Sequence, residues 1–362
     1  MTSSNPAIAP ASAVRIKLEP LISRVSRAAG STLRRAVWRG ARAAPALVLA
    51  FGIAAPGARA AEKPLDKVTL ALHWLAQCQF AGYFVALEKG YYRQQGIEMT
   101  IRTGAADTNN IQQVTAGAAD FGTRRLADVI GVVDKGAPVI SVAQILRSSG
   151  MVLVVRADSG INHPRDFANK RISIWLSGKE IQFYALMNQV GVDISKLKVS
   201  PMQYSVKPFL DGQYDVINAM TFNELPTLLK SVRRDQIRVF DFVDYGLNFP
   251  GDVLFTRRAM VKDHRDLARR MVRATLQGWR DALNDPEEAT RIVLKLDRTR
   301  KLDPDHQLAQ MKDVSRLIRL GDHALGTHVK EDVERVVGLL AKNKMISRRL
   351  TDNEIYTNEL LP

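Results

Sequence analysis

Residues 68–92 read "VTLALHWLAQCQFAGYFVALEKGYY" and contain the two local patterns that recur along the chain. The apolar run 68–72 predicts a buried strand, and the segment 80–95 predicts a helix. Strands and helices in alternation indicate a parallel sheet that is covered by helices. The stretch also holds Trp74 and the single cysteine, Cys78, which raises the question of whether it borders a catalytic site or a binding site.

The same alternation continues downstream as far as Arg258. Further strands are predicted at 97–101, 138–146, 151–155, 171–175, 216–220 and 252–256. Further helices are predicted at 109–117, 124–135, 179–190, 206–212 and 223–232. Beyond Arg258 only helices are predicted: 264–284 and 330–345 each have an apolar face, and Asp285-Pro286 starts another helix. These patterns fit either one large doubly wound domain or two smaller lobes.

The first 60 residues predict an export signal. A basic region up to Arg42 precedes the run "AAPALVLAFGIAAP", which is shorter than a membrane span of about 20 residues. The run is followed by Ala58-Arg59-Ala60, a small-x-small pattern of the kind a signal peptidase accepts. We therefore expect cleavage after Ala60 and a periplasmic protein, with an uncleaved anchor as the alternative. A Sec or a twin-arginine route (Arg34-Arg35) and a start codon further downstream all remain open.

The charge of the mature chain is moderate. The first 60 residues hold nine basic residues and one acidic residue, so they carry +8 of the formal charge of +15 and leave +7. A surplus of this size, without a basic stripe interleaved with aromatic residues, does not indicate nucleic-acid binding. A single cysteine cannot form an intrachain disulfide. The expected cleavage site is not followed by a cysteine to which a lipid anchor could be attached. We expect a freely diffusing monomer.

The segment 73–99, "HWLAQCQFAGYFVALEKGYYRQQGIEM", resembles the opening of the type II periplasmic binding proteins of the thiamine pyrimidine precursor family. That family groups solute receptors of ABC importers with fungal hydroxymethylpyrimidine phosphate synthases, and sulfonate and nitrate receptors are related to it. The likeness spans nearly the whole mature chain, through 114–122, 136–146, 163–175, 210–224 and 356–361.

The resemblance implies an α/β fold of two lobes with the ligand in the cleft between them. Each lobe would be a mainly parallel sheet covered by helices. Lobe I would consist of 62–152 and 255–325, lobe II of 153–254, and the helical segment 326–362 would pack on the lobes.

Three candidate ligand contacts belong to the first motif. Trp74, at the end of the first predicted strand, can stack on a flat heterocycle, as the resembling receptors do with this tryptophan; a core tryptophan is the alternative. Tyr83 and Phe84 follow in the next helix, where at least one should face the cleft, and Tyr83 offers a hydroxyl. His73 is a minor candidate, because neighbours in a strand face opposite ways and one of the pair should point inward.

Other candidates lie further along the chain. Asn223 and Glu224 follow a predicted strand, where an amide and a carboxylate can pair with an aminopyrimidine, although Asn223 could instead cap the next helix. Thr108, in "GAADTNN", and Ser177, in "SGKE", begin predicted helices whose N–H groups could bind an anion. An ordinary helix cap explains both segments equally well.

The sequence lacks the catalytic residues that the fungal synthases use. Those enzymes consume pyridoxal phosphate on a lysine, use a histidine four residues away, and need iron and a cysteine-rich run. This chain has Arg124 and Asp128 at the lysine and histidine positions, and arginine cannot form a Schiff base at pH 7. The segment 247–253, where the cysteines would fall, has none, and the six histidines lack metal-ligand spacing. We therefore expect that the protein is not an enzyme and that it binds no cofactor and no metal.

The sequence is thus expected to encode the periplasmic solute-binding component of an ABC importer, which binds a thiamine pyrimidine precursor or a similar nitrogen heterocycle and presents it to the permease. The alternatives are a hydroxymethylpyrimidine phosphate synthase and a receptor for sulfonate, nitrate or riboflavin. A carboxylate at Glu224 opposes small anions, whereas the mature charge of +7 favours them weakly.

Overall fold

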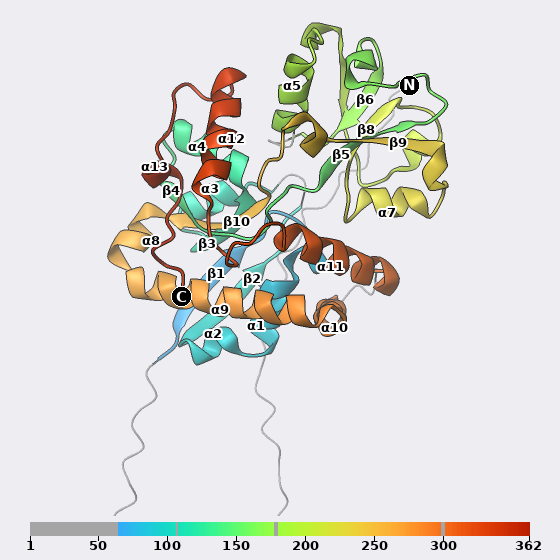
Figure 1. Cartoon of the computed structure of the whole chain (residues 1–362). Helices are drawn as coiled ribbons and strands as arrows, with labels where there is room; N and C mark the ends of the chain where they lie inside the picture. The colour runs from blue at the N-terminus through green and yellow to red at the C-terminus, as the bar shows by residue number, and fades with distance from the viewer. Residues whose placement is uncertain (1–63, 106–107, 177–179, 298–300) are drawn as a thin grey trace, which may run out of the picture. The chain divides into compact units, whose positions relative to one another are not determined.

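The computed structural model describes residues 64–362 except 106–107, 177–179 and 298–300. Its strands are β1 (Asp66–Ala71), β2 (Ile97–Arg102), β3 (Phe121–Arg125), β4 (Val139–Gln144), β5 (Met151–Arg156), β6 (Arg171–Ile174), β7 (Lys198–Pro201), β8 (Val216–Met220), β9 (Ile237–Asp241) and β10 (Asp252–Arg257). Over the described residues they form two five-stranded sheets (Figure 1). Sheet A has the order β2-β1-β3-β10-β4, and sheet B has the order β7-β6-β8-β5-β9.

The two sheets have the same connectivity, and in each a single strand runs against the others. In sheet A this strand is β10, which pairs antiparallel with β3 and β4; in sheet B it is β5, which pairs antiparallel with β8 and β9. The chain passes from sheet A to sheet B before β5 and returns before β10. The predicted mainly parallel α/β architecture is therefore confirmed, with one reversed strand where the chain enters each sheet from the other.

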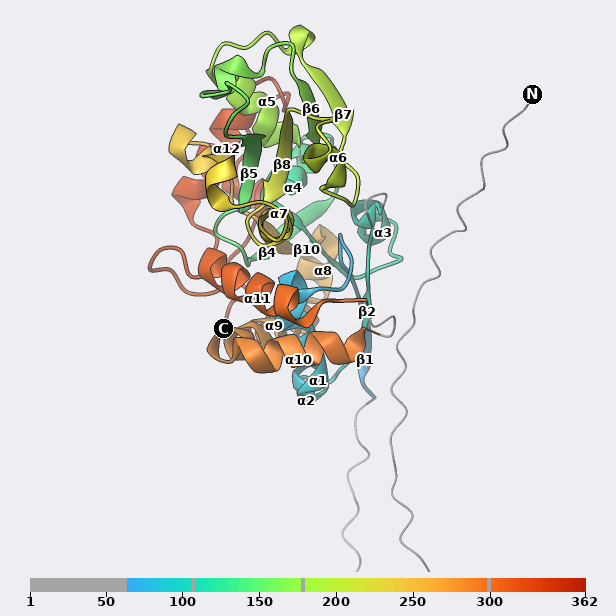
Figure 2. The same cartoon turned by 90° about the vertical axis from the view of Figure 1, so that its right-hand side faces the viewer.

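Helices pack on both sheets. They are α1 (Ala81–Glu88), α2 (Tyr91–Gln94), α3 (Asn110–Thr115), α4 (Leu126–Asp134), α5 (Glu180–Gln189), α6 (Lys207–Leu210), α7 (Glu224–Leu229), α8 (Arg258–Asp263), α9 (Arg265–Asn284), α10 (Pro286–Leu296), α11 (Pro304–Ile318), α12 (Lys330–Lys342) and α13 (Asp352–Ile355). Figure 2 shows α5 on one side of sheet B and α6 and α7 on the other.

The core follows the alternation of side chains along the strands. In β1, Val68 and Leu70 pack with α1 and α9, whereas Ala71 belongs to the cluster under α3, α4 and α12. In β5, Val152 and Leu153 likewise belong to different clusters. Because both faces are covered by helices, the strands read as nearly continuous apolar runs, which is why the sequence revealed most of them.

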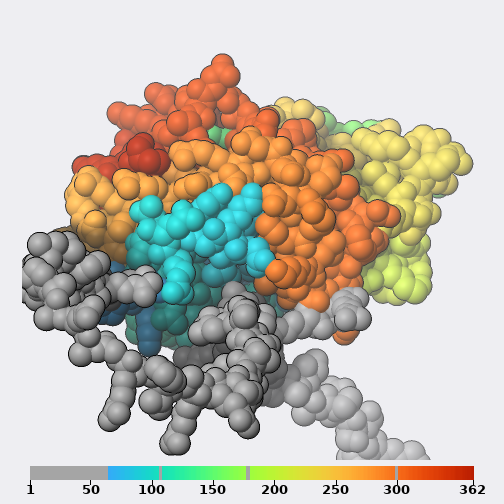
Figure 3. Space-filling model, turned by 90° about the horizontal axis from the view of Figure 1, so that it is seen from below, coloured from blue at the N-terminus to red at the C-terminus, as the bar shows by residue number. Residues whose placement is uncertain are grey.

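Two glycines bring α1 and α9 into close contact. The face seen from below in Figure 3 shows α9 and α10, in orange, beside the cyan residues around α2. The Trp279 ring fills the space beside Gly82: a β-carbon added to Gly82 would lie only 2.1 Å from the nearest atom of that ring. A β-carbon on Gly278 would lie 2.2 Å from the Gly82 carbonyl oxygen. Only glycine allows these backbones to approach so closely.

The structure differs from the sequence prediction at three strands. β3, β7 and β9 were not predicted, because "FGTRR" and "KVSP" carry polar residues and "IRVFD" alternates weakly. The helix predicted to start at residue 124 begins at Leu126, after β3. The predicted C-terminal helices are confirmed. Leu276 and Trp279 are buried on the apolar face of α9, Val333 is buried on that of α12, and α10 starts at Pro286.

Several predictions remain without a test. The described residues from Leu65 onward form one compact unit, so the lobe boundaries and the C-terminal segment 326–362 stay predictions. The export signal lies outside the described residues. Within the described part of the chain, no helix combines the length and apolarity required to cross a membrane.

Candidate functional site

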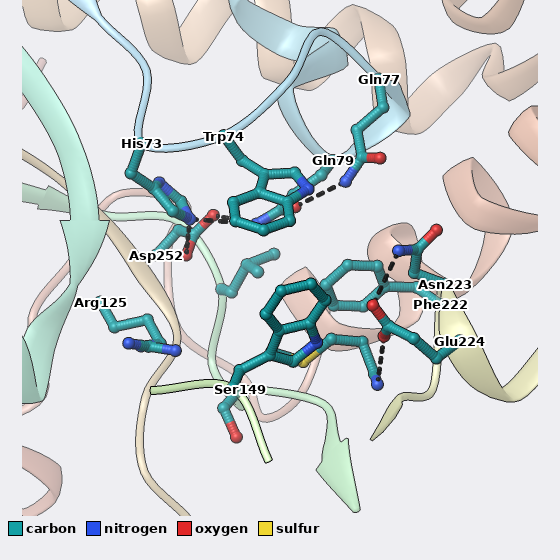
Figure 4. A pocket seen from close by; sticks show the side chains of 13 residues that line it. His73, Trp74, Gln77, Gln79, Arg125, Ser149, Phe222, Asn223, Glu224 and Asp252 are labelled. Carbon is teal, nitrogen blue, oxygen red and sulfur yellow. Dashed lines mark hydrogen bonds and ion pairs between the residues drawn. The ribbon is translucent and has the colours of Figure 1, made fainter. Parts of the chain in front are cut away.

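A pocket lies where strand ends of both sheets meet. Parallel strands present their carboxyl ends at one edge of a sheet, and the reversed strands β5 and β10 begin at that same edge. The lining residues accordingly come from the ends of β1, β3 and β4, the ends of β6 and β8, and the starts of β5 and β10. They are His73, Trp74, Gln77, Gln79, Arg125, Leu146, Ser149, Trp175, Met220, Phe222, Asn223, Glu224 and Asp252 (Figure 4).

His73 and Trp74 both line this pocket. Strand alternation predicted that one of them would point inward to the core, but β1 ends at Ala71 and both residues lie in the following loop. His73 is fixed on both ring nitrogens: Nδ1 lies 3.0 Å from Thr123 Oγ1, and Nε2 lies 3.7 Å from Asp252 Oδ1. The histidine thereby joins the end of β1 to β3 and β10.

Trp74 belongs to a cluster of three aromatic rings, and only 8% of its surface is exposed. The Trp175 ring, which follows β6 of sheet B, meets it edge to face with centroids 5.2 Å apart. The Tyr204 ring stacks on it with centroids 5.4 Å apart and planes 29° apart. Trp74 thus contacts aromatic rings of sheet B, an arrangement that stabilises contact between the sheets by roughly 0.5–1.5 kcal/mol for each ring pair beyond simple burial.

Asn223 and Glu224 form a fixed polar pair at the start of α7. Glu224 accepts hydrogen bonds from the Met220 backbone N–H (2.8 Å) and from Asn223 Nδ2 (3.1 Å). Asn223 occupies the cap position of α7, but its side chain makes no cap hydrogen bond; its Oδ1 lies 3.0 Å from His306 Nε2. Burial lowers the pKa of His306, which keeps the imidazole neutral. Both side chains are therefore held in place at one end of the pocket.

Charged groups also lie at the end of the pocket formed by sheet A. Arg125 is the last residue of β3, and its strand partner across the sheet is Asp252, the first residue of β10. The Arg125 Nη2 donates to both carboxylate oxygens of Asp128, at 2.9 and 3.3 Å. Asp252 accepts a 2.8 Å hydrogen bond from Gln79 Nε2. Figure 4 shows Arg125 and Asp252 on the side opposite Asn223 and Glu224.

Two predicted contacts, Tyr83 and Thr108, lie outside this pocket. Tyr83 is 99% buried and packs edge to face on Trp279 at 5.6 Å, since its position in α1 faces α9; burial raises the pKa of its hydroxyl well above the usual value. Phe84 is also buried outside the pocket. Thr108 lies shortly before α3, where its Oγ1 accepts from the Ala105 N–H, and it borders a separate surface depression. Ser177 lies outside the described residues.

The sequence did not single out several lining residues, among them Trp175, Arg125, Asp252 and Gln79. A repeat could have revealed the first of these, because Trp175-Leu176 after β6 repeats Trp74-Leu75 after β1. Both leucines are exposed beside their buried tryptophans. No local pattern marks Asp252 or Gln79, since they reach the pocket through strand reversal and a loop.

The pocket is small in this conformation. Its volume is about 30 Å³, roughly the space of one water molecule. Pockets for drug-sized molecules measure roughly 300–1,000 Å³, so a ring can enter only if the aromatic side chains or the sheets move apart. Among the described residues, no group of three or more His, Cys, Asp or Glu side chains is placed to hold a metal ion.

The sheet topology and the position of the pocket define the fold class of the protein. Two sheets of identical order, each with a reversed strand at the crossing and a pocket at the strand ends, form the fold of periplasmic binding proteins. The alkanesulfonate-binding protein SsuA from Xanthomonas axonopodis pv. citri, solved with MOPS bound, has this fold, with a TM-score of 0.61, 13% identity, and coverage of 82% of this chain and 99% of that one.

The chain belongs to the family described as NMT1/THI5 like, which matches residues 77–289, more than half of its length. The family resemblance read from the sequence is therefore confirmed.

Two relatives carry different names. The chain is 24% identical over 236 residues to the formylaminopyrimidine-binding protein of Halalkalibacterium halodurans, covering 64% of this chain and 71% of that protein. It is also 24% identical over 303 residues to the 4-amino-5-hydroxymethyl-2-methylpyrimidine phosphate synthase of Legionella pneumophila, covering 82% of this chain and 93% of that protein. Family membership thus supports a small-molecule site, and relatives of both kinds exist at similar identity.

Proposed function

We propose that this protein is the periplasmic solute-binding component of an ABC importer and that it binds a thiamine pyrimidine precursor or a similar flat nitrogen heterocycle. The observation that carries the proposal is the pair of indoles, Trp74 and Trp175, which come from different sheets and border one pocket. Aromatic walls on both sheets suit a planar ring, and sheet separation and closure would couple ring binding to docking on a permease.

The polar residues favour a ring that donates hydrogen bonds. Glu224 and Asp252 are carboxylates that are 9% and 5% exposed, and both line the pocket. A buried carboxylate attracts amino and ring N–H groups and repels small anions such as sulfonate or nitrate. The name of the Halalkalibacterium relative supports a pyrimidine ligand.

The second candidate is a pyrimidine phosphate synthase, which the Legionella relative favours by name. Against it stands the pair Arg124 and Asp128, at the positions where the resemblance places lysine and histidine. Arg124 Nε lies 2.9 Å from Asp128 Oδ2 in an ion pair. A guanidinium held in this way cannot form an aldimine with pyridoxal phosphate.

Thermal-shift measurements on the mature protein with different ligands distinguish between these candidate functions. Ligands that bind only the folded state raise Tm, so we expect a shift with aminopyrimidines and none with alkanesulfonates or nitrate. A shift with riboflavin alone would indicate a flavin receptor instead. Incubation with pyridoxal phosphate should leave its absorbance spectrum unchanged, and an aldimine band or a chemically altered ligand would support the synthase.

A further inference from the structure

One buried cation in the pocket has a side-chain nitrogen without an acceptor. Arg125 is 91% buried, and its Nη1 has no hydrogen-bond partner among the described residues. Its Nη2 is committed to Asp128, which fixes the plane of the guanidinium. Arginine keeps its charge in a protein interior, so burial cannot be relieved by losing a proton.

Arg125 belongs to the wall of the pocket. Arg125 and Ser149 border the main pocket together, and both also border a narrow cavity of about 10 Å³ beside it. The Ser149 hydroxyl donates to Gln182 Oε1 at 3.0 Å, so it is held in place. A buried donor without an acceptor is costly, and a ligand that supplies the acceptor gains affinity and specificity.

The position of Arg125 mirrors that of the polar pair Asn223 and Glu224 in the other sheet. β3 and β8 hold the same place in the orders β2-β1-β3-β10-β4 and β7-β6-β8-β5-β9. Arg125 ends β3, and Asn223 and Glu224 follow β8. The two sheets therefore offer a cation and a carboxylate from equivalent strand ends, and Figure 4 shows Arg125 and Glu224 on different sides of the pocket. Trp74 and Trp175 line the same pocket.

We propose that Arg125 selects ligands that carry an oxygen acceptor, either a carbonyl or an oxyanion, on the ring edge opposite the one that donates to Glu224. This inference rests on the proposed function and narrows it. Amines without such an oxygen would leave Nη1 unpaired and bind less tightly, because a site built to pair a polar group rejects the analogue that lacks it.

The test compares two probes that differ in one group: a formylaminopyrimidine and the same aminopyrimidine without the formyl group. Titration calorimetry on the mature wild-type protein should show tighter binding of the formylated probe. In Arg125→Gln the affinity for the formylated probe should fall by about 10-fold or more, while the affinity for the other probe should change by less than about 2-fold. Arg125→Lys should show an intermediate loss. A pyrimidine carboxylate as a third probe distinguishes an oxyanion from a neutral carbonyl, since an oxyanion should show the larger loss.

Arg147→Gln is the matched control. Arg147 is 93% buried, and its Nη2 also has no hydrogen-bond partner in the part of the chain that the structure describes, but the residue does not line the pocket. It should preserve the ratio of the two affinities. Equal weakening of both probes in folded Arg125→Gln and Arg125→Lys would overturn the proposal, as would unchanged affinities in both. Wild-type protein that binds neither pyrimidine would instead contradict the proposed function, and with it this inference.

Discussion

The indoles of Trp74 and Trp175 meet edge to face, with centroids 5.2 Å apart and ring planes at 83°. Trp74 follows β1 and Trp175 follows β6, and these strands hold the same place in the two sheets. Each sheet therefore contributes one tryptophan to the same pocket, and the two tryptophans follow strands in equivalent positions.

Replacing either tryptophan should weaken ring binding. We expect Trp175→Ala to reduce the affinity for an aminopyrimidine by about 10-fold, equivalent to ~1.4 kcal/mol, because one aromatic wall is lost. Trp175→Phe keeps a ring and should lose less than Trp175→Ala. Calorimetry on the purified mature proteins checks this, and equal affinities for all three proteins would show that the second indole does not contact the ligand.

Glu224 should contribute a charge-assisted hydrogen bond to the ligand. Glu224→Gln keeps the shape and the acceptor for the Met220 N–H but removes the charge. The affinity for an aminopyrimidine should fall by roughly 10- to 100-fold, in line with the worth of a charged hydrogen bond. Glu288→Gln, in the first turn of α10 outside the pocket, is the control and should bind as the wild type does. An unchanged Kd in Glu224→Gln would show that this carboxylate does not bind the ligand.

The buried His328 should make stability depend on pH. Its Nε2 lies 2.6 Å from Ser141 Oγ and its Nδ1 lies 3.0 Å from Asn358 Oδ1, which joins the C-terminal segment to β4. Burial lowers the pKa of His328 from 6.5 to about 4, and the charge of Arg147 adds to the shift. The folded pKa lies below the unfolded one, so this contribution is complete above pH 6.5 and is lost as the pH falls towards 4.

The loss should amount to about 3 kcal/mol of unfolding free energy across that range. Urea denaturation between pH 7 and 4 measures it, with His328→Gln as the comparison, because the variant lacks the titrating group while retaining the other acid-sensitive groups. Parallel pH curves for the two proteins would contradict the prediction.

The contact between α1 and α9 should tolerate no side chain at Gly278. A β-carbon there would lie 2.2 Å from the Gly82 carbonyl oxygen and 2.6 Å from Ala86 Cβ. We expect Gly278→Ala to destabilise the fold by about 1–3 kcal/mol or more. Gly338→Ala in α12, where nothing lies within 4 Å of the added carbon, should instead be neutral or stabilise by up to about 1 kcal/mol. Similar Tm values for the two variants would argue against this close packing.

The sequence by itself determined the α/β class and the family, since buried strands between helices leave apolar runs at readable spacing. It also revealed Trp74 and the Asn223-Glu224 pair, which stand in distinctive local sequence at strand ends and line the pocket of the structure. Tyr83 carried the same local signal but packs on Trp279, because the direction of a helix face depends on what packs against that helix.

Only the tertiary structure decided the rest of the pocket. Asp252 lies beside Arg125 because β10 runs antiparallel to β3, and pairing direction is a property of the returning chain that no local pattern encodes. Trp175 meets Trp74 across 101 positions of sequence because two sheets of equal topology present equivalent strand ends to each other. Neighbouring residues fix strands and helices through local sterics and periodicity, whereas the contacts that form a binding site join residues far apart in the chain.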